Sequence, residues 1–264
     1  MDRHDTDGSG GAASMPVALV TGGARRIGRA IVKDLAASGF AVAIHVNTSR
    51  EEGEALARDI REGGGKAAVV QADLTRADAP ARVAHDAAKA LGPVRLLVNS
   101  ASLFEPDEIG SLTLERYEAH QAIHTRTPVF LAQEMANALP AGLDGLIVNV
   151  IDQRVWKPTP QFFSYTLSKA ALWSATQTMA QGLAPRIRVN AIGPGPTLAN
   201  IRQQPEDFAK QVAAVPLRRG PGLDEFARTI RFLWETPSIM GQMIALDGGQ
   251  HLAWETPDVV GMVE

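Results

Sequence analysis

The sequence contains no cysteine among its 264 residues. Disulfide bonds and thiolate catalysis are therefore excluded, and the composition fits a reducing compartment, so we expect a cytoplasmic protein. No apolar run reaches the roughly 20 residues that a membrane-spanning helix needs, so we expect no membrane contact. The net charge of −3 predicts no general attraction to nucleic acid.

The two ends of the chain differ in composition from the part between them. Residues 1–15 are polar and Gly/Ser-rich and lack the apolar core of a signal peptide, so we expect a disordered N-terminal tail. Residues 253–264 follow the last strand-like segment and are expected to form a C-terminal arm. No Pro/Gly-rich linker interrupts residues 16–252, which favours one domain there.

Short apolar segments alternate with amphipathic helical segments along that domain. The strand-like segments are residues 16–21, 40–45, 66–73, 94–100, 145–150, 187–193 and 242–249. Continuously apolar strands separated by helices indicate a parallel sheet covered on both faces, which is a doubly wound α/β fold. The Pro- and Gly-rich residues 193–221 break this rhythm. A long insertion at the carboxyl end of a parallel sheet predicts a substrate loop.

The turn TGGARRIG, residues 21–28, joins the first strand to the first helix. Its small residues let the backbone approach a pyrophosphate bound at the helix N-terminus. A glycine pair after a strand indicates only a tight turn when taken alone, and its position in a βαβ unit favours the dinucleotide site. Arg26 stands where such a turn often has a third glycine. It either points a fork of donors into the cofactor crevice or is an exposed arginine at a helix start.

The end of the second strand indicates which dinucleotide is bound. NAD sites usually carry an acid there, and this chain has none before Glu51. Arg25, Asn47, Ser49 and Arg50 are instead available for a 2′-phosphate, so we expect NADP(H) as the cofactor.

Asp73 closes the third strand-like segment. It is expected either to bond to the adenine of the cofactor or to cap the turn that follows it.

Tyr165 and Lys169 are four residues apart and share one face of a predicted helix. An ammonium beside a phenol favours the phenolate, which suits a general acid or base. Asp152 lies thirteen residues before the tyrosine, at the end of an apolar strand. This pair and the acid are the most chemically distinctive residues of the chain.

Four short motifs occur in order at the predicted ends of strands and helices. They are Thr21-Gly22-(x)5-Gly28, NSAS at 99–102, Tyr165-(x)3-Lys169 and GPGPT at 193–197. Together they resemble the short-chain dehydrogenase/reductase family from about residue 16 to 252. The resemblance implies a Rossmann-type domain of seven mainly parallel strands, usually in a homotetramer, and hydride transfer from a nicotinamide. It also implies Tyr165 as proton donor and Lys169 as the residue that binds the ribose and lowers the pKa of the tyrosine.

Several positions depart from the usual pattern of that family. Asp152 replaces a serine, Arg26 a glycine, His124 an asparagine, and Ser100 the second asparagine of Asn-Asn-Ala. Ketone reduction builds negative charge on oxygen, which a serine stabilises and an ionised aspartate repels. Either Asp152 is kept protonated, or the substrate has a ring C=N whose nitrogen takes up a proton and whose neighbouring N–H groups bond to a carboxylate. His124 is either a satisfied buried histidine or a group that holds a water near Lys169.

The subgroup with this pattern is the pteridine reductases and the related dihydromonapterin/dihydrofolate reductases. By this resemblance Phe104 stacks on the pterin opposite the nicotinamide, Arg26 reaches the pterin edge and the pyrophosphate, and Ser102 lines the same site. The alternatives are that Phe104 only packs in the interior and that Asp152 only caps a turn.

The leading hypothesis is an NADPH-dependent pterin reductase with a small pterin- or folate-like substrate and no metal. A carbonyl reductase acting on a 3-oxoacyl thioester or another ketone is the alternative. A non-catalytic nucleotide-binding protein is disfavoured by the intact Tyr165 and Lys169. The expected catalytic residues are Asp152, Tyr165 and Lys169. The expected cofactor residues are Thr21, Gly22, Arg25, Arg26, Ile27, Gly28, Asn47, Ser49, Arg50, Asp73, Leu74, Asn99, Ser100, Ala101, Tyr165, Lys169, Pro194, Gly195 and Thr197. The expected substrate residues are Arg26, Ser102, Phe104, Asp152, Trp156, Tyr165 and Leu198.

Overall fold

The computed structural model describes residues 15–200, 202–256 and 259–260. The predicted N-terminal tail therefore lies outside the described residues except for its last residue. The predicted C-terminal arm is described in part. None of the helices in the described ranges is both long and apolar enough to cross a membrane.

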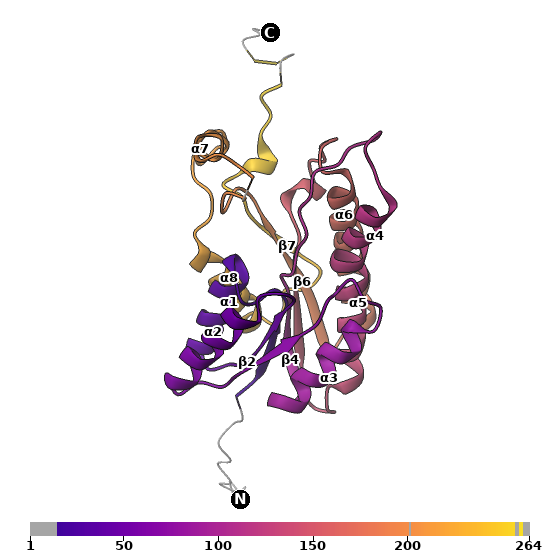
Figure 1. The fold of residues 1–264 in the computed structure, drawn as a ribbon, viewed down its shortest axis with the longest axis vertical. Helices are drawn as coiled ribbons and strands as arrows, with labels where there is room; N and C mark the ends of the chain where they lie inside the picture. Colours follow the sequence, from indigo (N-terminus) through magenta and orange to yellow (C-terminus); the bar gives the residue numbers. More distant parts are fainter. Residues whose placement is uncertain (1–14, 201, 257–258, 261–264) are drawn as a thin grey trace, which may run out of the picture.

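Seven strands form one sheet in the order β3-β2-β1-β4-β5-β6-β7, and every neighbouring pair is parallel (Figure 1). The strands are β1 (Val17–Val20), β2 (Ala41–Val46), β3 (Ala67–Gln71), β4 (Val94–Asn99), β5 (Gly145–Val150), β6 (Ile187–Pro194) and β7 (Met243–Leu246). In β1, β2 and β5 every residue is buried, because helices cover both faces of the sheet. The predicted Rossmann-type α/β fold is confirmed.

Two layers of helices enclose the sheet. The helices are α1 (Arg26–Ala37), α2 (Arg50–Glu62), α3 (Ala79–Leu91), α4 (Leu114–Gln121), α5 (Thr127–Ala138), α6 (Phe163–Leu183), α7 (Pro205–Ala213) and α8 (Leu223–Glu235). Apolar side chains of α1, α2 and α8 pack on one face of the sheet, and those of α3, α5 and α6 pack on the other. Helix α4 lies beside α6 (Figure 1).

Helices α4 and α5 belong to one continuous helical stretch. A π-helical turn, Ala122–Arg126, joins α4 directly to α5. Such turns insert an additional residue into a helix and often occur at functional sites. His124 lies within this turn and is buried.

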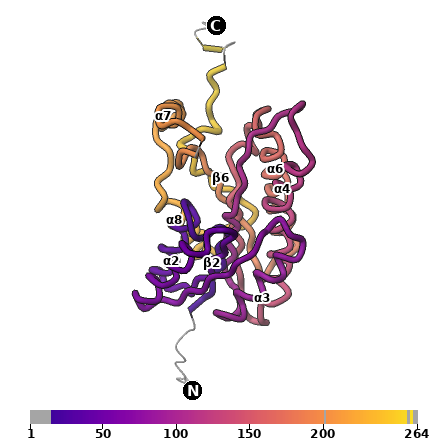
Figure 2. The backbone as a smooth tube through the Cα atoms, viewed as in Figure 1, coloured from indigo at the N-terminus to yellow at the C-terminus, as the bar shows by residue number. Residues whose placement is uncertain are grey.

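The strand order reverses between β2-β1 and β1-β4, which is where doubly wound sheets bind ligands at the carboxyl ends of their strands. The chain after β6 leaves the sheet at this same end and carries α7 (Figure 2). The predicted substrate loop, residues 193–221, therefore begins in β6 and contains α7, with residue 201 outside the described part.

Candidate active site

A cavity of about 710 Å³ opens at the carboxyl ends of the strands. Its wall comes from the turn after β1, the ends of β2 to β5, the start of α6 and the segment after β6. The predicted site residues that line it are Gly22, Arg25, Arg26, Ile27, Gly28, Asn47, Ser49, Asp73, Leu74, Ser100, Ala101, Ser102, Phe104, Asp152, Tyr165, Lys169, Pro194, Gly195, Thr197 and Leu198. Most of the site residues predicted from the sequence therefore lie around one cavity.

Four predicted site residues do not line this cavity: Thr21, Arg50, Asn99 and Trp156. The Thr21 hydroxyl accepts hydrogen bonds from the main-chain N–H groups of Ser100 (2.9 Å) and Ala101 (3.0 Å), so it holds the wall from behind.

The other three residues of this group make contacts elsewhere. Asn99 is buried and its Nδ2 donates to Oδ1 of Asn149 at 2.8 Å. The Trp156 side chain is 43% exposed and its ring centre lies 5.0 Å from that of His251. Arg50 donates to the Gln71 side chain at 3.2 Å.

The glycine turn brings α1 close to the chain that precedes it. A Cβ atom on Gly28 would lie 2.2 Å from the Gly22 carbonyl oxygen, so only glycine permits this approach. The first turn of α1 contains no acidic residue, and no side chain caps it. Its free N–H groups and the positive end of the helix dipole fit a pyrophosphate, as expected for a dinucleotide site.

His45, at the end of β2, lines the cavity and was missed by the sequence reasoning. Its Nδ1 accepts a hydrogen bond of 3.2 Å from the Gly22 N–H, and its Nε2 lies 3.1 Å from the Ala72 carbonyl oxygen. Burial lowers the pKa of His45 to about 4, so the ring is neutral and Nε2 carries the hydrogen. The sequence could have indicated this role, because His45 is the single polar residue in the otherwise apolar strand AVAIHV.

Only some of the residues expected around a 2′-phosphate are placed to bind one. Asn47 and Ser49 line the cavity, whereas the exposed Arg25 guanidinium is paired with Glu52. Oδ1 of Asp73 accepts from the N–H (2.9 Å) and the hydroxyl (2.7 Å) of Thr75. These hydrogen bonds lower the pKa of Asp73. Asp73 therefore caps the turn that follows it, which was one of its two expected roles.

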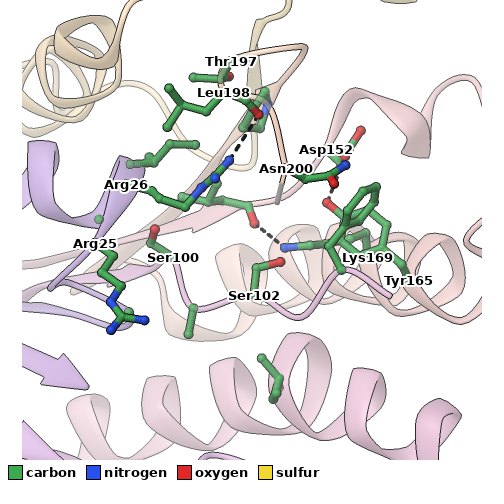
Figure 3. A pocket seen from close by; sticks show the side chains of 18 of the residues that line it. Arg25, Arg26, Ser100, Ser102, Asp152, Tyr165, Lys169, Thr197, Leu198 and Asn200 are labelled. Atoms are coloured by element: carbon green, nitrogen blue, oxygen red, sulfur yellow. Dashed lines mark hydrogen bonds between the residues drawn. The ribbon is translucent and has the colours of Figure 1, made fainter. Parts of the chain in front are cut away.

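Arg26 lines the cavity and joins two segments of its wall. Its backbone is left-handed, with φ of 51°. Its guanidinium donates to the carbonyl oxygen of Leu198 at 3.1 Å (Figure 3), and also to that of Ala199 at 3.0 Å. A non-glycine residue in this conformation is strained, and such strain occurs where the surrounding structure demands it. Arg26 thereby connects the glycine turn to the segment after β6.

Asp152 and Tyr165 are joined by a hydrogen bond (Figure 3). The tyrosine hydroxyl donates to Oδ2 of Asp152 at 2.9 Å, and Oδ1 accepts from the N–H of Arg154 at 2.9 Å. The aspartate therefore both caps a short 3-10 turn, Gln153–Val155, and contacts the tyrosine. Burial raises the pKa of Asp152, against the hydrogen bonds and charges that lower it.

The pKa of Tyr165 differs in direction from the expectation. Burial raises it well above its ordinary value, and the charge and hydrogen bond of Asp152 raise it further. The Lys169 ammonium, 5.6 Å from the centre of the tyrosine ring, donates to the Val150 carbonyl at 2.8 Å. Burial lowers the pKa of Lys169 to about 8. The phenol is therefore held in its protonated form.

His124 is a satisfied buried histidine, which was one of its two expected roles. The Ser168 hydroxyl donates to the Tyr165 carbonyl, so it accepts from Nδ1 of His124 at 2.8 Å. Nε2 then accepts from the Leu103 N–H at 3.1 Å, with the Ser102 hydroxyl also at 3.1 Å. Burial lowers the pKa of His124 well below its ordinary value. The neutral ring ties residues 102–103 to α6.

Phe104 lines the cavity with a second phenylalanine behind it. The ring of Phe162 stacks on it with centres 4.1 Å apart and planes within 6°, and Tyr165 makes an edge contact at 4.8 Å. Phe162 has φ of 56° and does not line the cavity. The strained residue therefore supports Phe104, a relationship that the sequence did not indicate.

Comparison with known proteins agrees with this geometry. The model of the short chain dehydrogenase family matches residues 16–209. The FolM alternative dihydrofolate reductase 1 of Brucella canis, solved in complex with NADP, is 62% identical, with 93% of this chain and 97% of that chain covered and a TM-score of 0.90. The FolM protein of Brucella suis, also in complex with NADP, is 63% identical, with coverages of 93% and 98% and the same TM-score.

A more distant relative extends the comparison beyond these two structures. The 3-oxoacyl-[acyl-carrier-protein] reductase of Synechocystis is 31% identical, with 90% of this chain and 98% of its own covered. A family model that matches most of the chain, a Rossmann-type sheet and a tyrosine–lysine pair at its carboxyl edge lead to one assignment. This chain belongs to the short-chain dehydrogenase/reductase family and is an oxidoreductase.

Proposed function

We propose that this protein is an NADPH-dependent reductase that transfers a hydride to a pterin ring. The observation that carries the proposal is the 2.9 Å hydrogen bond from Tyr165 to Asp152, a carboxyl group where the family usually has a serine. Phe104 offers an aromatic face in the same cavity. The two FolM proteins, which are named as dihydrofolate reductases and bind NADP, support this substrate class.

The residues at the turn end of the cavity fit the proposed cofactor. The close approach of Gly28 to Gly22 and the uncapped start of α1 suit the pyrophosphate. Asn47 and Ser49 stand at the end of β2, where a 2′-phosphate would lie, and Arg25 would exchange Glu52 for it. NADPH supplies the hydride.

The remaining end of the cavity suits a flat heteroaromatic ring. Phe104 is fixed by the stacked Phe162, so it presents a rigid aromatic face on which a ring can stack. Ser102 and Leu198 line the same end and would contact the edge of the ring. Trp156 lies outside this lining, and we leave it out of the proposed substrate site.

Asp152 and Tyr165 carry the proton chemistry. The raised pKa of Asp152 keeps its acid form populated closer to neutral pH than that of an exposed aspartate, and this form donates a proton to a ring nitrogen. Its ionised form accepts hydrogen bonds from ring N–H groups. Tyr165 keeps its own proton at neutral pH and remains a donor. Lys169 has two ammonium hydrogens beyond its bond to Val150, which suit a ribose hydroxyl.

Carbonyl reduction is the second candidate function. It is favoured by the tyrosine–lysine pair and by the similarity to the 3-oxoacyl reductase. The carboxylate of Asp152 opposes it, because an anion there repels the charge that develops on a ketone oxygen.

Parallel assays of NADPH oxidation decide between the two candidates. We expect turnover with 7,8-dihydrobiopterin and little with an acetoacetyl thioester, and a lower rate with NADH. The Asp152→Ser variant should lose pterin activity and gain ketone activity. Turnover of the thioester alone by the unchanged protein would overturn the pterin assignment.

We also propose a cytoplasmic homotetramer. Large apolar side chains are exposed on the outer helices, with Leu114 67%, Phe130 46% and Leu167 40% exposed on α4, α5 and α6. Large apolar side chains exposed on neighbouring outer helices are a feature of surfaces that form subunit contacts. Sedimentation equilibrium checks the assembly, and a monomer would contradict it. Cell fractionation checks the location.

A further inference from the structure

Arg154 lies in the cavity two residues after Asp152, in the short turn Gln153–Val155. Its guanidinium carbon is 5.3 Å from the ring centre of Phe104 and 5.1 Å from that of Phe162. Those parallel rings are only 4.1 Å apart, so a carbon almost equidistant from both lies beside the stack and not over a face. Its Nη1 is buried and has no hydrogen-bond partner among the described residues.

A second guanidinium reaches the same phenylalanine from another element. Arg202 lies between β6 and α7, lines the cavity, and donates to the main-chain oxygen of Phe104. In the described part of the chain, neither Arg154 nor Arg202 forms an ion pair with a carboxylate. Phe104 is therefore flanked by two cations, one on a fixed turn and one on the substrate loop.

The charges at this end of the cavity do not balance. Arg154, Arg202 and Lys169 line the cavity with two carboxyl groups, of which Asp73 is bonded to Thr75, so Asp152 is the acid nearest to them in the chain. That carboxyl already accepts hydrogen bonds from Tyr165 and from the Arg154 main chain, and burial opposes its ionisation. The partly buried Arg154 guanidinium is costly without a counter-ion, and an anionic ligand relieves that cost. Guanidinium forks match carboxylates and phosphates in geometry.

We propose that the substrate ring carries an anionic substituent, a carboxylate or a phosphate, which Arg154 and Arg202 bind beside Phe104. This inference rests on the proposed pterin reduction and names the class of pterin that the site takes. The ring stacks on Phe104 while its charged substituent extends along the edge of the Phe104–Phe162 stack to the two guanidinium groups. A pterin with a neutral side chain leaves both cations without an anionic partner.

The test compares kcat/KM for three substrates that share the dihydropterin ring. These are 7,8-dihydrofolate with carboxylates, 7,8-dihydroneopterin monophosphate with a phosphate, and 7,8-dihydrobiopterin with a neutral side chain. We expect at least one anionic substrate to be preferred by about tenfold or more, which is the effect of one charge-assisted contact. The preference should shrink as ionic strength rises. The better anion identifies the source of the charge.

Variants then assign the preference to its residues. Arg154→Gln and Arg202→Gln should each lower the ratio of anionic to neutral kcat/KM by about tenfold, with Arg154→Lys intermediate. Arg228→Gln removes a matched exposed arginine from α8, where it pairs with Asp224, and should leave the ratio unchanged. Arg202 is exposed, so its variant remains informative if Arg154→Gln fails to fold.

Each outcome has a distinct meaning. Equal kcat/KM for all three substrates would overturn the anionic substituent and leave pterin reduction standing. If both variants lose kcat/KM equally for the neutral and the anionic substrates, the proposal is also overturned, because the arginines would then bind the pterin ring or stabilise the fold. Turnover of no pterin, together with turnover of a ketone, would overturn the proposed function and this inference with it.

Discussion

Tyr165 and Asp152 share a hydrogen bond of 2.9 Å, and burial raises the pKa of both residues. An exposed aspartate is fully ionised at neutral pH, whereas this carboxyl group holds its proton to higher pH. A transferable proton is thus kept between Oη and Oδ2, next to the aromatic face of Phe104. Proton delivery to a ring nitrogen and hydrogen bonding to ring N–H groups can both occur at this one position.

Replacing the carboxyl group by an amide should remove the proton and preserve the shape. For Asp152→Asn we expect kcat with a dihydropterin to fall by about 10²- to 10⁴-fold. In the unchanged enzyme, activity should decline as pH rises through the raised pKa of Asp152, because the acid form is the donor. The variant should lack this decline. A pH–rate profile checks the prediction, and the same decline in the variant would assign it to Lys169.

Lys169 should make stability depend on pH in the alkaline range. Its pKa is about 8 in the folded protein and about 10.5 in the unfolded chain, so between these values the unfolded state binds more protons. The free energy of unfolding should therefore rise with pH over this range, by on the order of 3 kcal/mol in total. Urea unfolding between pH 7.5 and 9.5 measures the slope. Lys169→Met should flatten it, and an unchanged slope in that variant would contradict the prediction.

Gly28 should tolerate no side chain. In Gly28→Ala the new methyl group would lie 2.2 Å from the Gly22 carbonyl oxygen, which forces the turn and α1 apart. We expect a destabilisation of roughly 1–3 kcal/mol and a loss of NADPH affinity measurable by fluorescence titration. Gly182→Ala is the matched control, because its added methyl group meets no atom within 4 Å in α6. Equal NADPH affinity in the two variants would refute the close-approach argument.

His124 should act on the substrate through the residues that it holds. His124→Ala removes the acceptor of the Leu103 N–H and the partner of Ser168, which releases the chain before Phe104. We expect about 1–3 kcal/mol of destabilisation and a higher KM for the pterin, with a smaller change in NADPH affinity. His124→Gln, which keeps an acceptor, should recover part of the KM. The exposed His85→Ala serves as control, and a KM unchanged in His124→Ala would exclude the positioning role.

The strands and the location of the cavity followed from local sequence, because buried parallel strands must be apolar and ligand sites lie at their carboxyl ends. The tyrosine–lysine pair followed from helical spacing alone. The direction of the Tyr165 pKa did not, because it depends on burial and on Asp152, which lies in another element.

The contacts that the sequence did not predict all join residues that are far apart in the chain. Arg25 pairs with Glu52, His45 bonds to Gly22, and Phe162, whose backbone is left-handed, stacks on Phe104. No periodicity or motif records such pairings. Arg154 is similar, since it lies beside two rings that come from other segments of the chain.

The bridge from Arg26 to Leu198 and Ala199 has a thermodynamic consequence. Arg26 belongs to the glycine turn, where the nucleotide would bind, and its side chain holds the segment after β6, which lies next to the proposed substrate site. A ligand that orders either part favours the ordered state of the other. Any coupling that results is reciprocal, so NADPH and substrate should change each other's affinity by the same factor. We therefore expect NADPH and substrate to bind cooperatively, so that the enzyme without one of them has a lower affinity for the other.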